Sequence, residues 1–329
     1  MVAYTIRRLL LIIPTFFLIT ILVFLSTRFI PGDVIDMMLA QMNTSGTAAD
    51  MTRQNLEKAL GLDVPVHIQY FRWLGVAPQE KGEFRGLLQG NLGKSLWKNE
   101  SVTKLLVERL PVSVELGLIA MTTAILIALP IGVYSAIRQD TWGDYVSRSI
   151  AIIFISVPSF WVGTLIFVYP PIWWGWSPPT VYIPITENFL GNLGQFLLPG
   201  FITGMIMGGT LMRMMRTMML ETLRQDYIRT AWAKGLRERT VNIRHALKNA
   251  LLPVVTIIGG MVPMVIVGAV IMEQIFALPG VGILTFQALG QRDYPLIQGI
   301  NVILASVVLL SNIVVDLTYS WIDPRVKYR

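Results

Sequence analysis

Apolar runs long enough to cross a lipid bilayer are the strongest constraint that this sequence sets. A transmembrane helix needs about 20 mostly apolar residues, and six separate runs reach that length. Apolar residues make up 53% of the 329 residues and charged residues 14%, whereas a soluble domain carries about 25% charged residues. We therefore expect an all-α integral membrane protein with six transmembrane helices.

The six expected spans are unevenly spaced along the chain. Arg7 and Arg8 precede the first span as in a signal peptide, but no small-x-small cleavage site follows, and we interpret this run as an uncleaved anchor. Pro111 and Pro130 fall in the second span, where neighbouring helices can satisfy the carbonyl groups that a proline frees. The expected spans cover residues 9–30, 105–136, 146–170, 196–220, 250–275 and 297–321.

The intervals between the spans define the expected domain organisation. Residues 31–104 mix charges, glycines and amphipathic pieces such as 66–74, and we expect a large external loop that rests partly on the membrane surface through its aromatic residues. The other regions are the N-terminus with the first helix (1–30), a five-helix transmembrane domain (105–321) with a cytoplasmic loop (221–249), and a C-terminal tail (322–329).

Lysine and arginine residues predict the orientation, because they accumulate in short cytoplasmic loops. They occur at both chain ends and at Arg138 and Arg148, after the second span. Between Arg213 and Lys248, nine basic minus three acidic residues gives +6 of the total net charge of +7. Both termini and this segment are therefore expected in the cytoplasm. A basic segment is also typical of nucleic-acid binding, but in a membrane chain we interpret it as a cytoplasmic loop and expect no nucleic-acid partner.

Residues that could carry chemistry are missing. The chain has no cysteine, which excludes thiolate zinc sites and a cysteine nucleophile. His67 and His245 are far apart in the sequence. Gly90–Ser95 resembles a phosphate-binding loop, but the first glycine that this loop requires is replaced by Leu88. We expect neither an enzyme nor a metal site.

Ionisable residues inside the spans are few. Glu115, Glu273 and Asp316 all fall near the ends of expected spans. An ion or proton relay would need such groups in the interior of the bundle. Their positions favour interfacial or paired carboxylates, and they argue against a secondary transporter.

Residues 220–253 carry the functional inference. Leu220, Leu223, Tyr227, Ala231 and Lys234 fall on roughly one helical face, with Ile228 and Trp232 alongside. Gly235 permits a tight turn that a side chain would obstruct, and a second helical stretch (238–250) leads to Pro253 at the expected start of the fifth span. An apolar face flanked by charges fits the groove of a partner protein, but it also suits anionic lipid, so the pattern alone leaves both open.

A family resemblance favours the partner protein. The run Asp226-Tyr227-Ile228-Arg229-Thr230-Ala231-x-Ala233-Lys234-Gly235, continued by 245–253, resembles the coupling loop of the dipeptide/oligopeptide permease family of ABC importers. Where the general permease pattern has Glu-Ala-Ala, this chain has Arg229-Thr230-Ala231, as in the peptide-family variant. Further similar elements occur in order at Arg7-Arg8, Pro31-Gly32-Asp33, Leu60-Gly61-Leu62-Asp63, Gly90-Asn91-Leu92-Gly93, Arg109-Leu110-Pro111, Pro158-Ser159-Phe160-Trp161, Pro279-Gly280-x-Gly282, Arg292-Asp293-Tyr294-Pro295 and Asp323-Pro324-Arg325.

The resemblance, to the first of that family's two permease subunits, implies the fold, the function and the partners. The fold would be that of an ABC type I importer permease, and the chain would form half of a pathway for di- or oligopeptides or similar solutes across a bacterial inner membrane. Its partners would be a second homologous permease subunit, two ABC ATPase subunits, an external solute-binding protein and membrane lipid. No cofactor is expected in this chain, because ATP and Mg²⁺ would bind to the ATPase subunits.

The resemblance leaves the solute open among dipeptides, oligopeptides, nickel chelates, glutathione and oligosaccharides. Two other functions stay open as well: a stand-alone secondary transporter, and a membrane scaffold or receptor that transports nothing. Reconstitution of the chain with and without its partners would separate them.

Two sets of candidate site residues follow. Gly200, Gly204 and Gly208 recur every four residues in the fourth span and would form a smooth stripe against which another helix can pack closely. We expect Tyr227, Ala231 and Trp232 to face the ATPase or the adjoining bundle. The residues assigned to ATPase coupling are Arg224, Asp226, Tyr227, Ile228, Arg229, Thr230, Ala231, Trp232, Lys234, Gly235 and Arg237.

Overall fold

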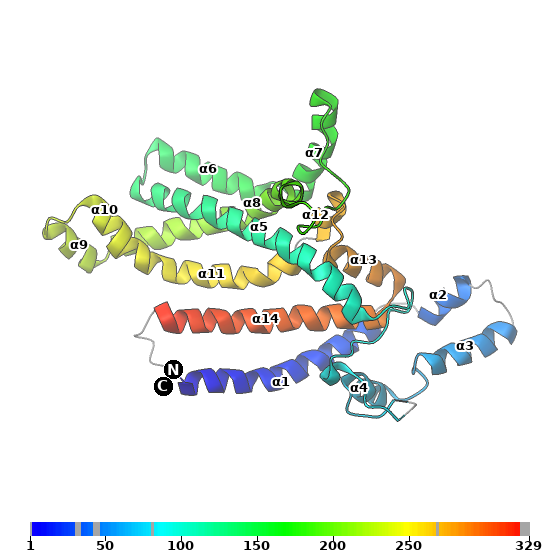
Figure 1. Ribbon diagram of the computed structural model, residues 1–329. Coiled ribbons are helices and arrows are strands. Elements are labelled where there is room, and N and C mark those ends of the chain that lie inside the picture. Colours follow the sequence, from blue (N-terminus) through cyan, green and yellow to red (C-terminus); the bar gives the residue numbers. More distant parts are fainter. Residues whose placement is uncertain (1, 30–33, 42–46, 80–81, 268–269, 323–329) are drawn as a thin grey trace. The chain divides into compact units, whose positions relative to one another are not determined.

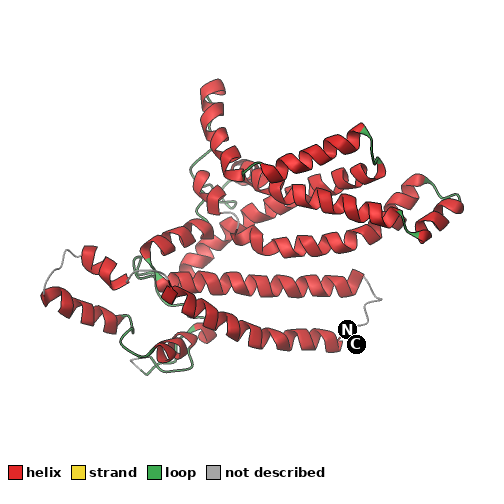
Figure 2. Cartoon of the chain, turned by 180° about the vertical axis from the view of Figure 1, so that it is seen from behind, coloured by secondary structure: helices red, strands yellow, loops and turns green. Residues whose placement is uncertain are grey.

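The computed structural model describes residues 2–29, 34–41, 47–79, 82–267 and 270–322. In these ranges the regular elements are helices, apart from one isolated antiparallel bridge between Lys94 and Ser101 (Figures 1 and 2). Five described helices are long and apolar enough to cross a membrane, and a bent pair qualifies as a sixth if it is counted as one span. The expected all-α membrane fold is thus confirmed.

Residue contacts divide the chain into two compact units. The first unit is built mainly from Leu110–Ile283, and the second consists of Arg7–Arg109 together with Leu284–Ser306. The motifs 31–33 and 323–325, which contribute to the family resemblance, lie outside the described residues.

The first unit is organised around one long helix, α8 (Phe189–Leu223), on which α6, α7 and α11 pack (Figure 1). Methionine and small residues dominate its buried face, since Met207, Met212, Met215 and Met219 are all buried. The other helices of this unit are α5 (Val102–Ile137, from Leu110 onward), α6 (Trp142–Ser156), α7 (Ser159–Trp174), α9 (Asp226–Ala233), α10 (Glu238–Thr240), the π-helix η3 (Val241–Leu247), α11 (Lys248–Val267) and α12 (Val270–Ile275).

The glycine stripe of α8 lies against α5. A Cβ atom at Gly200 would approach Ile119 Cγ2 to 2.5 Å, and one at Gly204 would approach the carbonyl oxygen of Ala120 to 2.5 Å. Gly208 is looser, since its Cβ would lie 3.6 Å from Ala124 Cα. Absence of side chains at Gly200 and Gly204 therefore lets the two backbones come together, which is how small residues act between membrane helices.

The third expected span, 146–170, is not one straight helix. It consists of α6 and α7, whose axes differ by 87°. The break falls at Val157 and Pro158, and both have extended backbone angles. A proline disfavours helical geometry in the residue before it and has no N–H to donate, so α6 ends at Ser156 and a new helix begins after Pro158.

The fifth expected span also differs from the prediction. Helical structure runs without interruption from Glu238 through α10 and η3 into α11, so the stretch that we expected in the cytoplasm and the membrane stretch form one continuous rod. Pro253, which we expected at the start of the span, lies inside α11. The expected end of this span belongs to a separate helix, α12.

Two carboxylates of the first unit, Glu273 and Glu115, accept hydrogen bonds. Glu273 is buried, and its carboxylate accepts hydrogen bonds from Ser113 Oγ (2.6 Å) and from the backbone N–H of Ile283 (3.1 Å). Glu115 accepts a weak hydrogen bond from Asn192 Nδ2 (3.4 Å). These contacts agree with the interpretation of both residues as paired carboxylates. The side chain of Asp316 lies outside the described part of the structure.

The second unit joins the end of the first span to a set of short helices. Phe24 on α1 packs against Tyr70 and Trp73 on α4, with ring centroids 5.4 and 5.7 Å away, and Thr20 shares a hydrogen bond of 3.0 Å with the Tyr70 hydroxyl. The amphipathic piece at 66–74 is therefore a helix that rests on α1. The elements of this unit are α1 (Val2–Ser26, from Arg7 onward), η1 (Thr27–Phe29), α2 (Val34–Gln41), α3 (Thr47–Ala59), α4 (Val66–Leu74), η2 (Leu87–Gln89) and the adjoining parts of α5, α13 (Val281–Gln291) and α14 (Tyr294–Ile322).

Asp293 fixes the loop after η2 to the start of α14. Its buried carboxylate accepts hydrogen bonds from Ser95 Oγ (2.5 Å) and from the backbone N–H of Leu96 (3.2 Å). Trp97 Nε1 donates to the carbonyl of Gln291 (2.7 Å). The run that superficially resembles a phosphate-binding loop therefore ends on a carboxylate of its own chain, which leaves no place for a phosphate beside Ser95.

Candidate functional site

The connection between α8 and α11, residues 224–247, folds into short helices at one end of the first unit, and we call this segment the bracket. α8 ends at Leu223, the chain turns at Arg224 and Gln225, and α9 begins at Asp226. After a second turn at Lys234–Arg237, α10 and η3 lead back into α11. Figures 1 and 2 both place α9 and α10 beyond the ends of α6, α8 and α11, where they project from the bundle.

α9 has one buried face and one exposed face. Ile228 and Ala231 are buried, and α9 packs on η3, whose Val241 and Ala246 are buried as well. Tyr227 and Trp232 are 42% and 46% exposed. α9 thus presents aromatic and charged side chains outward while two apolar residues attach it to the rod that enters the membrane.

Charged groups surround the exposed aromatic side chains. Arg229 Nη1 donates to Asp226 Oδ1 (3.3 Å), and their side chains are 76% and 95% exposed. Such an exposed pair contributes little to stability, so these charges are available to a partner. Arg224, Lys234 and Arg237 are exposed around the same helix, which gives the outer face of the bracket a basic border.

Gly235 makes the turn after α9. Its φ of +72° lies in the left-handed region, which glycine adopts without steric cost and most other residues avoid. Its N–H donates to the carbonyl of Trp232 (2.9 Å), and the next N–H, of Leu236, donates to Ala231 (3.4 Å). No atom lies within 4 Å of a Cβ built at this position, so the backbone angle, and not crowding, requires glycine here.

A hydrogen bond joins α9 directly to α11. Asn249 Nδ2 donates to the hydroxyl oxygen of Tyr227 (2.8 Å) and to the carbonyl of His245 (3.2 Å). Asn249 is in the first turn of α11, so this contact couples the position of α9 to the start of a membrane helix. Tyr227 is therefore partly exposed while its hydroxyl is held by Asn249 of α11.

A buried ion pair holds the other side of the bracket. Asp144 at the start of α6 is fully buried, and Arg216, two turns before the end of α8, donates to it twice. Ser135 Oγ donates to the same carboxylate, and so does the backbone N–H of Asp140 (3.1 Å). These contacts tie the α5–α6 connection to the helix that leads into α9.

The structure brings together most of the residues assigned to coupling, but not on the single face that was expected. The prediction that Leu220 and Leu223 share a helical face with Tyr227 was wrong, because α8 ends at Leu223 and a separate helix, α9, starts after Gln225. Ala231 and Ile228 form the inner face, whereas Tyr227, Arg229, Thr230 and Trp232 are exposed. Arg224, Lys234, Gly235 and Arg237 occupy the two turns.

Sequence reasoning missed Asn249 and Asp144. Asn249 lies in a run that supported the resemblance, but nothing in that run shows that its amide meets Tyr227. Asp144 is the only acidic residue in the first two turns of α6, and Arg216 is one of nine basic residues between 213 and 248. An isolated acidic residue in a chain with an excess of basic residues was the available signal for this ion pair.

Metal binding finds no support in the described residues. Within the described ranges, no group of three histidine, cysteine, aspartate or glutamate side chains is placed to hold a metal ion. The bracket instead offers an exposed aromatic and basic surface, attached rigidly to α8 and α11. Such an arrangement suits mechanical contact with another protein.

Comparison with protein families covers nearly the whole chain. A family model described as a binding-protein-dependent transport system inner membrane component matches residues 128–328. A second model, described as the N-terminal part of such a membrane component, matches residues 1–117. The bracket lies inside the first match, together with the Leu284–Ser306 part of the second structural unit, and the Arg7–Arg109 part of that unit lies inside the second match.

Curated relatives match over their full lengths. The chain is 37% identical over 328 residues to a putative peptide transport system permease protein of Brucella abortus, with all of both chains covered. It is 38% identical over 331 residues to the oligopeptide transport system permease protein AppB of Bacillus subtilis, again with both chains fully covered. The dipeptide transport system permease protein DppB of Alkalihalophilus pseudofirmus is 37% identical over 348 residues, with full coverage of both.

Proposed function

Since the chain belongs to the family of binding-protein-dependent transport system inner membrane components, we propose that α9 and the turn at Gly235 receive the motion of an ATPase subunit and pass it to the membrane helices. Membership makes the chain the permease subunit of an ABC importer, a multi-pass membrane protein that works with ATPase and substrate-binding components. It is not an enzyme, because ATP is hydrolysed in separate subunits.

The observation that carries the proposal is that α9 has one exposed face and one face that packs on the bundle. Its outer face is exposed and rich in aromatic and charged groups, and its inner face is packed on η3. η3 continues into α11 without a break. A force on the outer face therefore acts on a membrane helix through packed side chains and one hydrogen bond, with no flexible linker between them.

The proposed mechanism is rigid-body transmission. ATP binding would close a pair of ATPase subunits, and closure would displace α9 together with the ends of α8 and α11. Packed interfaces respond to such displacements by switching between discrete arrangements, so the bundle would alternate between outward-open and inward-open states. Each role of the coupling residues follows from their position: Tyr227 and Trp232 contact the ATPase, Ile228 and Ala231 attach the helix, and Gly235 sets its angle.

The assembly and orientation are part of the same proposal. The complex would contain this subunit, a second homologous permease, two ATPase subunits and an external solute-binding protein. ATP and Mg²⁺ would bind only to the ATPase subunits. The basic border of α9 supports a cytoplasmic position for the bracket and for both termini, because lysine and arginine accumulate on that side.

The proposed solutes are di- or oligopeptides or solutes of similar size. This assignment rests on the relatives, whose names describe peptide, oligopeptide and dipeptide transport. Selection of the solute would be the task of the external binding protein, since the pathway is shared with a second permease.

Reconstitution tests the proposal. The tagged chain, purified with the subunits that accompany it, is placed in liposomes with the solute-binding protein, and uptake of a labelled dipeptide is followed with and without ATP. Uptake that requires ATP and the ATPase subunits is expected. Uptake by the isolated chain down an ion gradient would instead establish a secondary transporter, and no uptake with all partners present would indicate a scaffold.

A further inference from the structure

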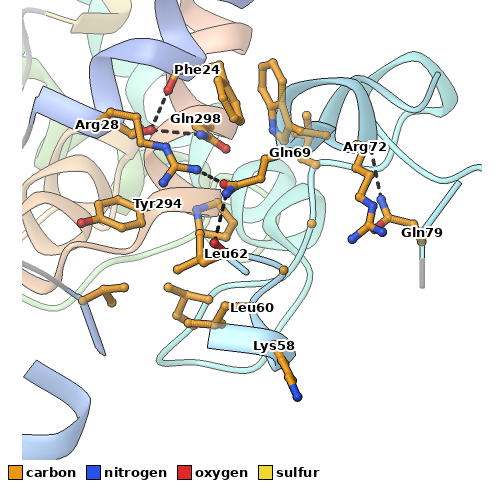
Figure 3. Close-up of a pocket in the computed structure, with 18 of the residues that line it drawn as sticks. Phe24, Arg28, Lys58, Leu60, Leu62, Gln69, Arg72, Gln79, Tyr294 and Gln298 are labelled. Carbon is orange, nitrogen blue, oxygen red and sulfur yellow. Dashed lines mark hydrogen bonds between the residues drawn. The ribbon is translucent and has the colours of Figure 1, made fainter. Parts of the chain in front are cut away.

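A cavity of about 450 Å³ lies within the second unit, at the end of α1. Its walls come from η1 at the end of α1, from the loop between α3 and α4, from α4 itself and from the first turn of α14 (Figure 3). The volume falls in the range of about 300–1,000 Å³ that is typical of small-molecule sites. None of the residues of the proposed coupling site contributes to it.

A positioned guanidinium points into this cavity. Arg28 donates through Nη2 to Gln69 Oε1, and the Gln69 amide is itself fixed, since its Nε2 donates to the carbonyls of Val64 (2.7 Å) and Leu62 (3.3 Å). Arg28 also stacks over the ring of Phe24, with Cζ 5.5 Å from the centroid. The guanidinium thus has a defined position before any ligand arrives.

Within the part of the chain that the structure describes, Arg28 makes one side-chain hydrogen bond, to Gln69. A guanidinium has five N–H donors, and among the described residues Gln69 is the only hydrogen-bond partner of Arg28 and no carboxylate pairs with it. Lys58 and Arg72 also line the cavity, and Glu83 is the one acidic residue among its described lining residues. The site is therefore suited to an anion, and the planar fork of arginine matches phosphate oxygens well.

Apolar side chains line part of the cavity as well. Figure 3 shows Arg28, Gln69, Gln298 and Tyr294 on one side of the cavity, with Leu60 and Leu62 facing them. Gln298 is held by a hydrogen bond from its Nε2 to Thr27 Oγ1 (3.0 Å). A ligand that fits must therefore combine an anionic group, which meets Arg28, with hydrocarbon, which meets the two leucines.

The cavity lies at the level where two membrane spans end. The apolar run of α1 extends over Leu10–Phe29 and that of α14 starts at Tyr294, so Arg28 and Tyr294 are both at a boundary between hydrocarbon and water. Phospholipid phosphates occupy this level, and tryptophan and tyrosine are enriched there. Trp73 and Tyr294 both line the cavity.

We propose that this cavity binds an anionic phospholipid, with the phosphate on Arg28 and the glycerol and first acyl carbons against Leu60 and Leu62. Bound lipid would join α1, α4 and α14 where the external loop meets the membrane. The chemistry that is recognised is a phosphate monoester or diester anion, and the attached hydrocarbon distinguishes a lipid from a free phosphate.

Native mass spectrometry of the purified complex tests the proposal. Phosphatidylglycerol is added in steps, and lipid retained on the complex is compared between the wild type and Arg28→Gln. We expect the variant to bind phosphatidylglycerol roughly tenfold more weakly, as loss of a charge-assisted hydrogen bond predicts. Arg138→Gln, which alters an exposed arginine at the end of α5, is the matched control and should bind as the wild type does.

A second variant and two other probes complete the test. Leu62→Trp leaves Arg28 in place but fills the cavity, and it should also reduce retention of phosphatidylglycerol. Phosphatidylcholine, whose choline offsets the phosphate charge, should be retained less, and glycerol phosphate should not displace the lipid at equal concentration. Equal retention by both variants and the wild type would overturn the proposal, and so would equal retention of the two lipids or displacement by glycerol phosphate, which would assign the cavity to a free anion.

Discussion

Arg216 on α8 makes a bidentate contact with Asp144 on α6. Nε donates to Oδ1 and Nη2 donates to Oδ2, each at a distance of 2.8 Å. The carboxylate is fully buried, and the arginine side chain is 21% exposed. This geometry fixes both the distance and the relative rotation of the two helices at the end that carries α9. The α5–α6 connection and the bracket should therefore move as one body.

Asp144→Asn should destabilise this end of the bundle. The substitution leaves a largely buried guanidinium without its counter-charge, which costs about 3 kcal/mol in comparable buried pairs. We expect a lower thermal midpoint for the purified complex and reduced ATP-driven uptake. Asp63→Asn, at an exposed acid of the second unit, should leave both unchanged. The double variant Asp144→Leu/Arg216→Met should recover most of the lost midpoint, and a wild-type midpoint for Asp144→Asn would refute this role.

Gly235→Val should uncouple ATP hydrolysis from uptake while leaving membrane insertion intact. A φ of +72° costs an L-residue about 1–2 kcal/mol, and more for a β-branched one, so the turn should relax and α9 should change its angle. Gly235→Asn is the control, because asparagine tolerates this region and the space around the Cβ is open. Normal solute-stimulated ATPase activity and uptake in Gly235→Val would be incompatible with the proposed role of the turn.

Tyr227→Phe removes only the hydroxyl that accepts from Asn249. The loss of one hydrogen bond of this kind costs about 1 kcal/mol, so the complex should assemble and hydrolyse ATP. Because the direct link between α9 and α11 is gone, the number of solute molecules moved per ATP should fall. Tyr145→Phe, at another exposed tyrosine, should transport with the wild-type ratio. An unchanged ratio in Tyr227→Phe would show that packing alone transmits the motion.

Gly204→Ala should destabilise the contact between α5 and α8. Its Cβ would lie 2.5 Å from the Ala120 carbonyl oxygen, so the helices must separate, at a cost of about 1–3 kcal/mol for overpacking. Gly194→Ala, on the same helix, meets no atom within 4 Å and should be neutral. Comparison of the two thermal midpoints checks the prediction, and equal midpoints would mean that α5 does not approach α8 as closely as described.

Apolar run length was sufficient to identify most spans. α1, α5, α8 and α14 were predictable because each has a mostly apolar run of the required length. The break at Pro158 could have been inferred, since proline restricts the residue before it, but Pro111 and Pro130 lie inside the unbroken α5. A proline alone therefore does not show whether neighbours will stabilise a kinked helix or the chain will start a new one.

The structure of the bracket was only partly predictable from the sequence. The glycine turn and the helix before it follow from local sequence, because φ preference and periodicity are local properties. The partners of Asp144 and Tyr227 are distant in sequence, since 72 residues separate Asp144 from Arg216 and 22 separate Tyr227 from Asn249. Contacts of this kind depend on how helices pack, and a single sequence gives no direct signal for them.

Crosslinking from α9 tests the central claim most directly. The chain has no cysteine, so Arg229→Cys creates one reactive site on the exposed face of α9, and Asp63→Cys creates a control in the loop 31–104, which we expect on the external side. Both are treated with a photoactivatable thiol reagent in inside-out vesicles that contain the whole complex. The account predicts an adduct between position 229 and an ATPase subunit, and none from position 63. If position 229 reacts only in right-side-out vesicles, which expose the external side, and gives no ATPase adduct, the proposed contact between α9 and the ATPase is contradicted.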